Sequence, residues 1–161
     1  MGIQVSDHTA TLARKRMAAS VLFFDDADRV LLVEPTYKPY WELPGGAVEA
    51  DESPHAAACR EVTEELALSR SAGRLLAVDW VPPQPNRTEG VIFVFDGGHL
   101  SSVEGAALTV PPDELRGWSW CTVEEAAERL SPLLARRLVE ALRARESGEV
   151  AYLENGSRYP A

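Results

Sequence analysis

Apolar residues along the chain form short runs typical of strands and longer stretches with helical spacing. Residues 16–24 (RMAASVLFF) and 30–34 (VLLVE) are strand-like runs, and the polar segment 25–29 between them predicts a hairpin. Two more strands are expected at 73–81 and 89–98, on either side of a proline-rich loop, and another at 116–122. The loop at 35–46 should contain a short extended piece around Trp41 to Leu43.

Helical spacing predicts the remaining elements. A helix is expected over 54–67, and a helical stretch over 123–146 contains Pro132, which should break it into two helices. The pattern from Gly148 onward is ambiguous. Strands interrupted by helices at two points indicate an α/β or α+β sandwich in which helices cover a mixed sheet. The chain has 161 residues, of which 45% are apolar, so we expect a single domain over 1–161 with its core at about 17–145.

Charge and cysteine content narrow the function classes. With 25 acidic and 16 basic residues, the formal net charge of −9 argues against a nucleic acid polymer as the partner. An anionic ligand would therefore need metal ions to mediate its binding. The two cysteines show no ligand spacing, and there is no apolar stretch of membrane-spanning length or signal-peptide character. We expect a reduced, cytoplasmic protein without a membrane partner.

The helix expected at 54–67 has two contrasting sides. Ser53 supplies an N-cap and Pro54 is tolerated in the first turn. At 100° per residue, an arc of about 100° holds three carboxylates, those of Glu61, Glu64 and Glu65. The opposite side should pack on the sheet through Cys59, Val62 and Leu66.

Three carboxylates on one helix face have two explanations. Hard divalent cations such as Mg²⁺ and Mn²⁺ prefer oxygen ligands, and Mg²⁺ is commonly held by carboxylates together with substrate phosphates. The alternative is a solvated acidic helix face, which is the usual fate of a run of charge. The surrounding residues favour the metal site.

Gly46 is followed, after five residues, by Glu52 and, after seven more, by REVTEELAL at 60–68. This pattern resembles the Nudix box of the Nudix hydrolases at every fixed position except one, because Ala67 stands where the family has glycine. The preceding WELPGG also resembles the family lead-in. The resemblance implies a Nudix-like α/β/α sandwich with a mixed β-sheet. It also implies metal-dependent hydrolysis of a nucleoside diphosphate linked to another group X.

The resemblance also implies roles for individual residues. Glu61, Glu64, Glu65 and the Gly46 carbonyl would bind Mg²⁺ or Mn²⁺, while Glu52 and Arg60 would pair and act as a structural brace. A carboxylate must accept the proton of the attacking water. The candidates for this catalytic role are Glu61, Glu64 and the more distant Glu114.

Ala67 is the one departure from the family pattern. The family glycine ends the helix because a residue without Cβ adopts left-handed backbone angles at little cost. Alanine is expected either to lengthen the helix or to strain its end. It removes no ligand, so the metal site should survive.

The substrate is less closely specified. Pro82 and Pro83 lie some fifteen residues beyond the box, as a proline does in some ADP-ribose hydrolysing members, and this favours an ADP-ribose-like substrate. Candidate substrate-binding residues are Tyr40, Trp80 and Arg87. Tyr37 and Trp41 also offer aromatic faces, although such residues beside a sheet are more often core. A nucleotide-pool hydrolase of modified (d)NTPs and a non-catalytic nucleotide-binding module remain as alternatives, and a homodimer is compatible with the family.

Overall fold

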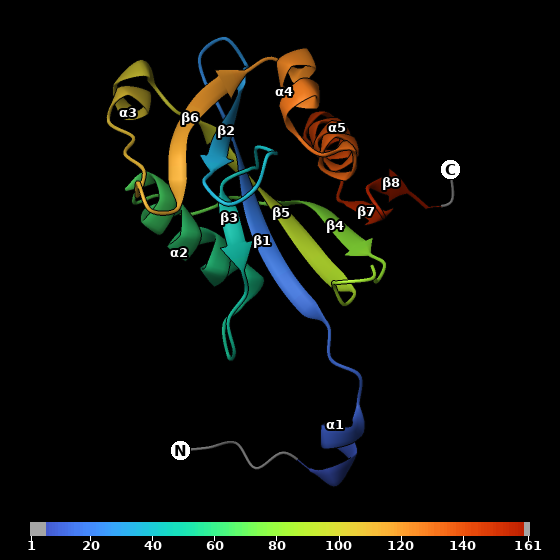
Figure 1. Ribbon diagram of the computed structural model, residues 1–161. Helices are drawn as coiled ribbons and strands as arrows, with labels where there is room; N and C mark the ends of the chain where they lie inside the picture. The colour runs from blue at the N-terminus through green and yellow to red at the C-terminus, as the bar shows by residue number, and fades with distance from the viewer. Residues whose placement is uncertain (1–5, 160–161) are drawn as a thin grey trace.

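Strand β1 (Arg16–Phe24) lies near the centre of an eight-stranded mixed sheet in the computed structural model, which describes residues 6–159 (Figure 1). The strand order is β6-β2-β1-β5-β4-β7-β8, and β3 also pairs with β1. The other strands are β2 (Val30–Pro35), β3 (Gly45–Ala47), β4 (Leu75–Val81), β5 (Gly90–His99), β6 (Leu115–Cys121), β7 (Ala151–Glu154) and β8 (Ser157–Arg158). The β1–β5 and β4–β7 pairs are parallel and the others antiparallel.

Helices lie on both faces of this sheet. They are α2 (Pro54–Leu66), α3 (Ser102–Ala106), α4 (Val123–Arg129) and α5 (Pro132–Ser147), whereas α1 (Asp7–Thr11) precedes β1 and lies away from the sheet (Figure 1). Side chains of β1 alternate between two core clusters, because successive residues of a strand point to opposite faces. Leu22 and Phe24 pack with residues of α4 and α5, whereas Val21 and Phe23 pack with residues of α2. The expected α/β sandwich is therefore confirmed.

Most of the elements expected from the pattern are present. The β1–β2 hairpin, the strands at 75–81, 90–99 and 115–121, and the break at Pro132 are all confirmed. The extended piece at 41–43 pairs through Glu42 with Val33. Elements without a periodic apolar pattern were not expected, namely α1, α3, β3, β7 and β8. Within residues 6–159, no helix has the length and apolar character that crossing a bilayer requires.

A buried ion pair attaches the C-terminal strands to the sheet. Arg137 Nε donates to Asp79 Oδ2 at 2.7 Å, and both side chains are buried. The other carboxylate oxygen of Asp79 accepts the N–H of Gly156 at 3.0 Å, in the turn between β7 and β8. A buried charge is costly unless paired and hydrogen-bonded. The pair therefore fixes α5 and the β7–β8 turn against β4, and the sheet extends past residue 145.

Candidate metal and catalytic site

Helix α2 has the ends and the buried side that its sequence predicts. The Ser53 hydroxyl accepts the N–H of Ala56 at 3.1 Å, as an N-cap does. The buried residues of the helix are Ala57, Ala58, Val62 and Leu66, and Cys59 is half-buried. This side packs against β1 and β3, so the carboxylates of the acidic face lie beside β3 and the loops around it.

Ala67 ends the helix in the conformation that favours glycine. Its backbone angles are φ 53° and ψ 29°, and its N–H donates to the carbonyl of Thr63. Alanine was expected either to lengthen the helix or to strain its end. The helix is not lengthened, because α2 ends at Leu66 and the chain turns at Ala67. A residue with a Cβ pays about 1 kcal/mol or more in this region. The strain is therefore located at Ala67 itself.

Two glycines let β3 approach its neighbours closely. Gly46 is paired with Ala19 of β1, and a Cβ on Gly46 would lie 2.4 Å from Oε1 of Glu61. Gly45 has φ +150°, and a Cβ there would lie 2.2 Å from the carbonyl oxygen of Ala19. The absence of a side chain at Gly46 allows the Glu61 carboxylate to rest directly on β3. Its absence at Gly45 allows β3 to approach β1.

Arg60 connects the loop before α2 to the acidic face. Its Nε and Nη2 donate to the two carboxylate oxygens of Glu52 at 2.9 and 3.0 Å, and Nη2 also donates to the Ala47 carbonyl at 3.0 Å. Its Nη1 donates to Glu61 Oε1 at 2.9 Å and to Glu64 Oε2 at 3.1 Å. A bidentate arginine pair of this kind fixes geometry as well as charge.

The glutamates differ in their exposure and in their pKa. The Glu61 side chain is 16% exposed and that of Glu64 is 56% exposed. Burial, with the negative charges of Glu61, Glu42 and Glu114, raises the pKa of Glu65 to about 8, although the N–H of Gly45 donates to its Oε2 at 2.9 Å. Burial also raises the pKa of Glu61, and the charges of Glu64 and Glu114 add to this effect, whereas Arg60 opposes it.

The carboxylate oxygens of these glutamates are the kind of ligand that a hard divalent cation prefers. Burial and the charges of neighbouring carboxylates raise the pKa values of Glu61 and Glu65, so a cation beside them would relieve this repulsion. Among the described residues 6–159, no three acidic, histidine or cysteine side chains are arranged to hold a metal ion as they stand. Arg60 accounts for this arrangement, because its guanidinium holds oxygens of both Glu61 and Glu64. Each of these two carboxylates has a second oxygen that Arg60 does not hold, and through it the carboxylate could bind a cation while it stays oriented by the guanidinium.

Glu114 lies close to this cluster although it is distant in sequence. The Thr36 N–H donates to the Glu114 carbonyl at 2.9 Å, and the Thr36 hydroxyl donates to the Asp113 carbonyl at 3.1 Å. These bonds tie the start of the 36–44 loop to the loop before β6. The charge of Glu114 contributes to the raised pKa values of both Glu61 and Glu65, so Glu114 lies within electrostatic range of the two carboxylates.

Tyr37 and Lys38 lie near the same cluster. The sequence offered Tyr37 as one of several aromatic faces and did not single out Lys38. Burial and the charges of four site glutamates raise the pKa of Tyr37. Lys38 forms an ion pair with Glu42, and its Nζ lies 5.2 Å from the centre of the Tyr37 ring. One clue was available, because Lys38 is one of only two lysines in the chain.

The other expected substrate residues lie in two different places. Tyr40 is exposed in the 36–44 loop. Trp41 is part of the core, with the Arg129 guanidinium 4.7 Å from its ring centre. Trp80 is on β4 and donates its indole N–H to Glu89 at 2.7 Å, and Arg87 is exposed in the following loop. Strands β1 and β5 separate β4 from β3, so the structure does not place Trp80 against the glutamates.

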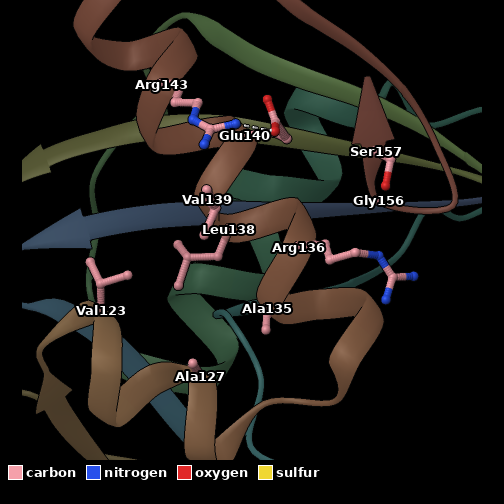
Figure 2. A pocket seen from close by; sticks show the side chains of 10 residues that line it. All are labelled: Val123, Ala127, Ala135, Arg136, Leu138, Val139, Glu140, Arg143, Gly156 and Ser157. Carbon is pink, nitrogen blue, oxygen red and sulfur yellow. Dashed lines mark hydrogen bonds and ion pairs between the residues drawn. The ribbon is translucent and has the colours of Figure 1, made fainter. Parts of the chain in front are cut away.

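Two hollows lie away from the carboxylates. One of about 380 Å³ lies between α4, α5 and the β7–β8 turn (Figure 2). Its floor is apolar, with Leu138 and Val139, and Glu140 inside it pairs with Arg143. A second hollow, of about 350 Å³, lies between the β1–β2 turn, α3 and Trp120. Neither of these two hollows is lined by residues of the acidic face.

Comparison with known proteins shows which family this chain belongs to. The model of the NUDIX domain matches residues 14–142, and the chain therefore belongs to the Nudix hydrolase family. A MutT-like protein of Streptomyces ambofaciens is 33% identical over 125 residues, which cover 77% of this chain and 74% of that protein. The chain is accordingly an enzyme of the Nudix hydrolase class.

Solved structures agree on the fold. A UDP-X diphosphatase superimposes with a TM-score of 0.70 at 20% identity, covering 91% of this chain and 70% of the other. The NUDIX domain of Shewanella oneidensis NrtR, complexed with ADP ribose, superimposes with a TM-score of 0.67 at 20% identity. The match covers 85% of this chain and 92% of that one. At this identity the similarity concerns the fold alone.

Proposed function

We propose that the protein hydrolyses the pyrophosphate bond of a nucleoside diphosphate linked to X, with an ADP-ribose-like compound as the favoured substrate and Mg²⁺ or Mn²⁺ as the cofactor. The observation that carries this proposal is that two glutamates of the acidic face are largely buried against β3: the Glu61 carboxylate rests on Gly46, and Glu65 accepts the N–H of Gly45. A solvated acidic helix face would not bury its carboxylates against a strand.

Each residue of the site has a proposed role in this hydrolysis. A bound divalent cation would neutralise charge on the pyrophosphate and lower the pKa of water. Glu61 and Glu65, which are buried beside β3, would hold it together with the Gly46 carbonyl and Glu64. The proton of the attacking water would pass to Glu64 or Glu114, which are the more exposed carboxylates of the cluster. Arg60 and Glu52 would keep α2 in register with the loop before it.

Substrate contacts are proposed for the 36–44 loop. Lys38 is a cation beside an otherwise acidic site, so it would bind a phosphate oxygen. Tyr37 and Tyr40 expose aromatic rings on the same loop and would contact the nucleoside. Trp80 and Arg87 would contribute only if the X group extends across β1 and β5.

The substrate class rests on two kinds of support. Pro82 and Pro83 follow the box at the spacing of ADP-ribose hydrolysing relatives, and fold neighbours include proteins described with ADP ribose and UDP-X. The similarity to a MutT-like protein favours a second candidate, a (d)NTP pyrophosphohydrolase of the nucleotide pool. The two candidates differ in their products, which makes them separable.

The test is a product assay over a substrate panel. Phosphate, pyrophosphate and nucleoside monophosphate would be measured with Mg²⁺ and with Mn²⁺, using ADP-ribose, nucleotide sugars, NADH, dinucleoside polyphosphates and canonical and oxidised (d)NTPs. We expect AMP and ribose phosphate from ADP-ribose as the preferred reaction. Release of pyrophosphate from a (d)NTP at higher kcat/KM would favour the second candidate.

Matched variants separate the site from the fold. Glu64→Gln should abolish the activity, since it removes a half-exposed carboxylate whose only partner within the described chain is Arg60. Glu128→Gln on α4 makes the same chemical change at an exposed position away from the site, and should leave activity unchanged. Equal activity in Glu64→Gln and the wild type would contradict the assignment of the site. An inactive wild type that binds Mg²⁺ would favour the nucleotide-binding module.

A further inference from the structure

The hollow between α4, α5 and the β7–β8 turn, which we call the α4–α5 groove, has an aliphatic lining. Side chains of α4 and α5 face each other across it (Figure 2). Val123 is 37% exposed, and among the described residues Val123, Ala127 and Val139 belong to neither core cluster. These side chains are therefore left over from the packing of the core. The apolar side chains of the groove are those of Val123, Ala127, Ala135, Leu138 and Val139.

The walls of the groove are held in place from behind. Arg137, on α5, is buried and pairs with Asp79, whose carboxylate also accepts the N–H of Gly156 in the β7–β8 turn. A Cβ on Gly156 would lie 2.8 Å from the carbonyl oxygen of Leu133, so this turn is packed directly on α5. The groove is therefore formed before any ligand arrives, as most small-molecule sites are.

Arginines border the groove, in a chain whose formal net charge is −9. Arg143 Nη1 and Arg158 Nε each donate to one oxygen of Glu140, both at 2.7 Å, so both oxygens of this carboxylate have partners. The remaining N–H groups of Arg143 have no partner within residues 6–159. With Arg136, three guanidiniums and one carboxylate give a local charge of +2. The other carboxylates of α4 and α5 do not line the groove.

The size and lining of the groove limit what it can bind. Its volume of about 380 Å³ is typical of small-molecule sites, which occupy about 300–1,000 Å³. Ten residues line it, whereas a protein–protein interface uses about 20–30 on each side. In the described part of the chain no lining residue is aromatic, so the groove offers no ring for a nucleobase to stack on. An aliphatic chain with an anionic head suits both the lining and the arginines.

We propose that the α4–α5 groove binds a monomeric aliphatic acid. Its chain would lie on Val123, Leu138 and Val139, where burial removes apolar surface of both partners from water. Its carboxylate or phosphate head would accept hydrogen bonds from the Arg143 guanidinium, whose planar fork matches either group. The glutamates of the acidic face do not line this groove, so the proposal is independent of the hydrolysed substrate.

The experiment titrates the full chain with octanoate, octyl phosphate and octylammonium, and measures binding by isothermal titration calorimetry. The three probes share one aliphatic chain and differ in the head group. We expect one molecule of octanoate or octyl phosphate to bind per chain. Octylammonium should bind at least tenfold more weakly, because the arginines repel its charge. The anion with the higher affinity identifies the head group that the groove prefers.

Two pairs of variants locate the binding site. Val123→Glu places a charge in the aliphatic lining at the start of α4, and should raise the dissociation constant of the bound anion at least tenfold. Val103→Glu makes the same change at the start of α3, at a position that is 77% exposed and outside the groove, and should leave the constant unchanged. Arg143→Ala should also weaken binding about tenfold, whereas Arg116→Ala, at an exposed position on β6, should not. Circular dichroism would show that all four variants remain folded.

Three results would overturn the proposal. The first is a wild type that binds neither anion with a dissociation constant below about 1 mM. The second is octylammonium binding as tightly as the anions, which would show that the charge of the head group is not read. The third is equal weakening by Val123→Glu and Val103→Glu, which would place the bound anion elsewhere. Unchanged binding in Arg143→Ala would refute the position given to the head group.

Discussion

Arg60 donates two parallel hydrogen bonds to Glu52, from Nε to Oε1 at 2.9 Å and from Nη2 to Oε2 at 3.0 Å. The two residues lie eight positions apart, on α2 and on the loop that leads into it. The remaining amino group of the guanidinium reaches Glu61 and Glu64. One side chain thus fixes the loop and holds two proposed metal ligands.

Arg60→Lys is expected to weaken metal-dependent activity. Lysine keeps the charge but lacks the planar fork that binds both oxygens of Glu52. Residues that orient metal ligands commonly contribute about 10- to 100-fold to metal affinity or activity. The measurement is the Mg²⁺ concentration that gives half-maximal activity, which should rise by this factor. Arg70→Lys makes the same change outside the acidic face and should have no effect. An unchanged Mg²⁺ requirement in Arg60→Lys would refute the brace.

The raised pKa of Glu65 predicts how stability depends on pH. Its folded-state pKa of about 8 is above its ordinary value of 4.5. Its contribution to the stability of the metal-free protein is therefore fully present below about pH 4.5 and is lost as pH rises through about 8. Thermal melting in EDTA should show this decline. Glu65→Gln, which cannot ionise, should show a flatter profile, and a profile identical to that of the wild type would exclude Glu65 as its cause.

Mg²⁺ binding should show the opposite trend with pH. A carboxylate must be deprotonated to bind a metal ion, so the apparent affinity should rise with pH until it levels off above about pH 8. Calorimetric titrations in two buffers of different ionisation enthalpy would detect the released proton. Binding that releases no proton near neutral pH would show that Glu65 is not a ligand.

Lys38 is expected to contribute to substrate binding more than to the chemical step. Lys38→Ala should raise KM about tenfold, because a charge-assisted hydrogen bond to phosphate contributes about 1.5–3 kcal/mol. Its kcat should change little, as expected for a contact equally strong in ground and transition states. Lys15→Ala changes the only other lysine, which pairs with Glu89 away from the acidic face, and its KM should match that of the wild type. Equal effects of the two substitutions would rule out a specific contact.

Replacing Ala67 by glycine should stabilise the protein. The left-handed conformation of Ala67 costs more for alanine than for glycine, so relief of about 1 kcal/mol is expected. For a chain of this size that corresponds to about 2–4 °C in Tm. Ala107 ends α3 with φ −88°, where glycine offers no such relief, and Ala107→Gly should lower stability. A Tm for Ala67→Gly at or below that of the wild type would contradict the strain.

Local patterns were sufficient for much of the fold. Strands β1 and β2 and helices α2, α4 and α5 carry clear apolar periodicity, and their limits follow caps and prolines such as Ser53 and Pro132. Strand β7 could not be expected, because only two of its four residues are buried and its stability depends on pairing with β4. Its attachment through Asp79 and Arg137 joins residues 58 positions apart.

The sequence by itself determined the family and the spacing of the carboxylates on α2, because a helix converts fixed intervals in the chain into one face. At Ala67 the sequence left open whether the helix would be lengthened or strained at its end, and the structure shows a helix end with a φ of 53° there. Only the tertiary structure decided that Glu114 and Tyr37 lie within electrostatic range of that face. The bond between Thr36 and Asp113, 77 positions apart, depends on β2 pairing with β6. No local interval encodes such a contact, because it forms only when distant strands close the same sheet.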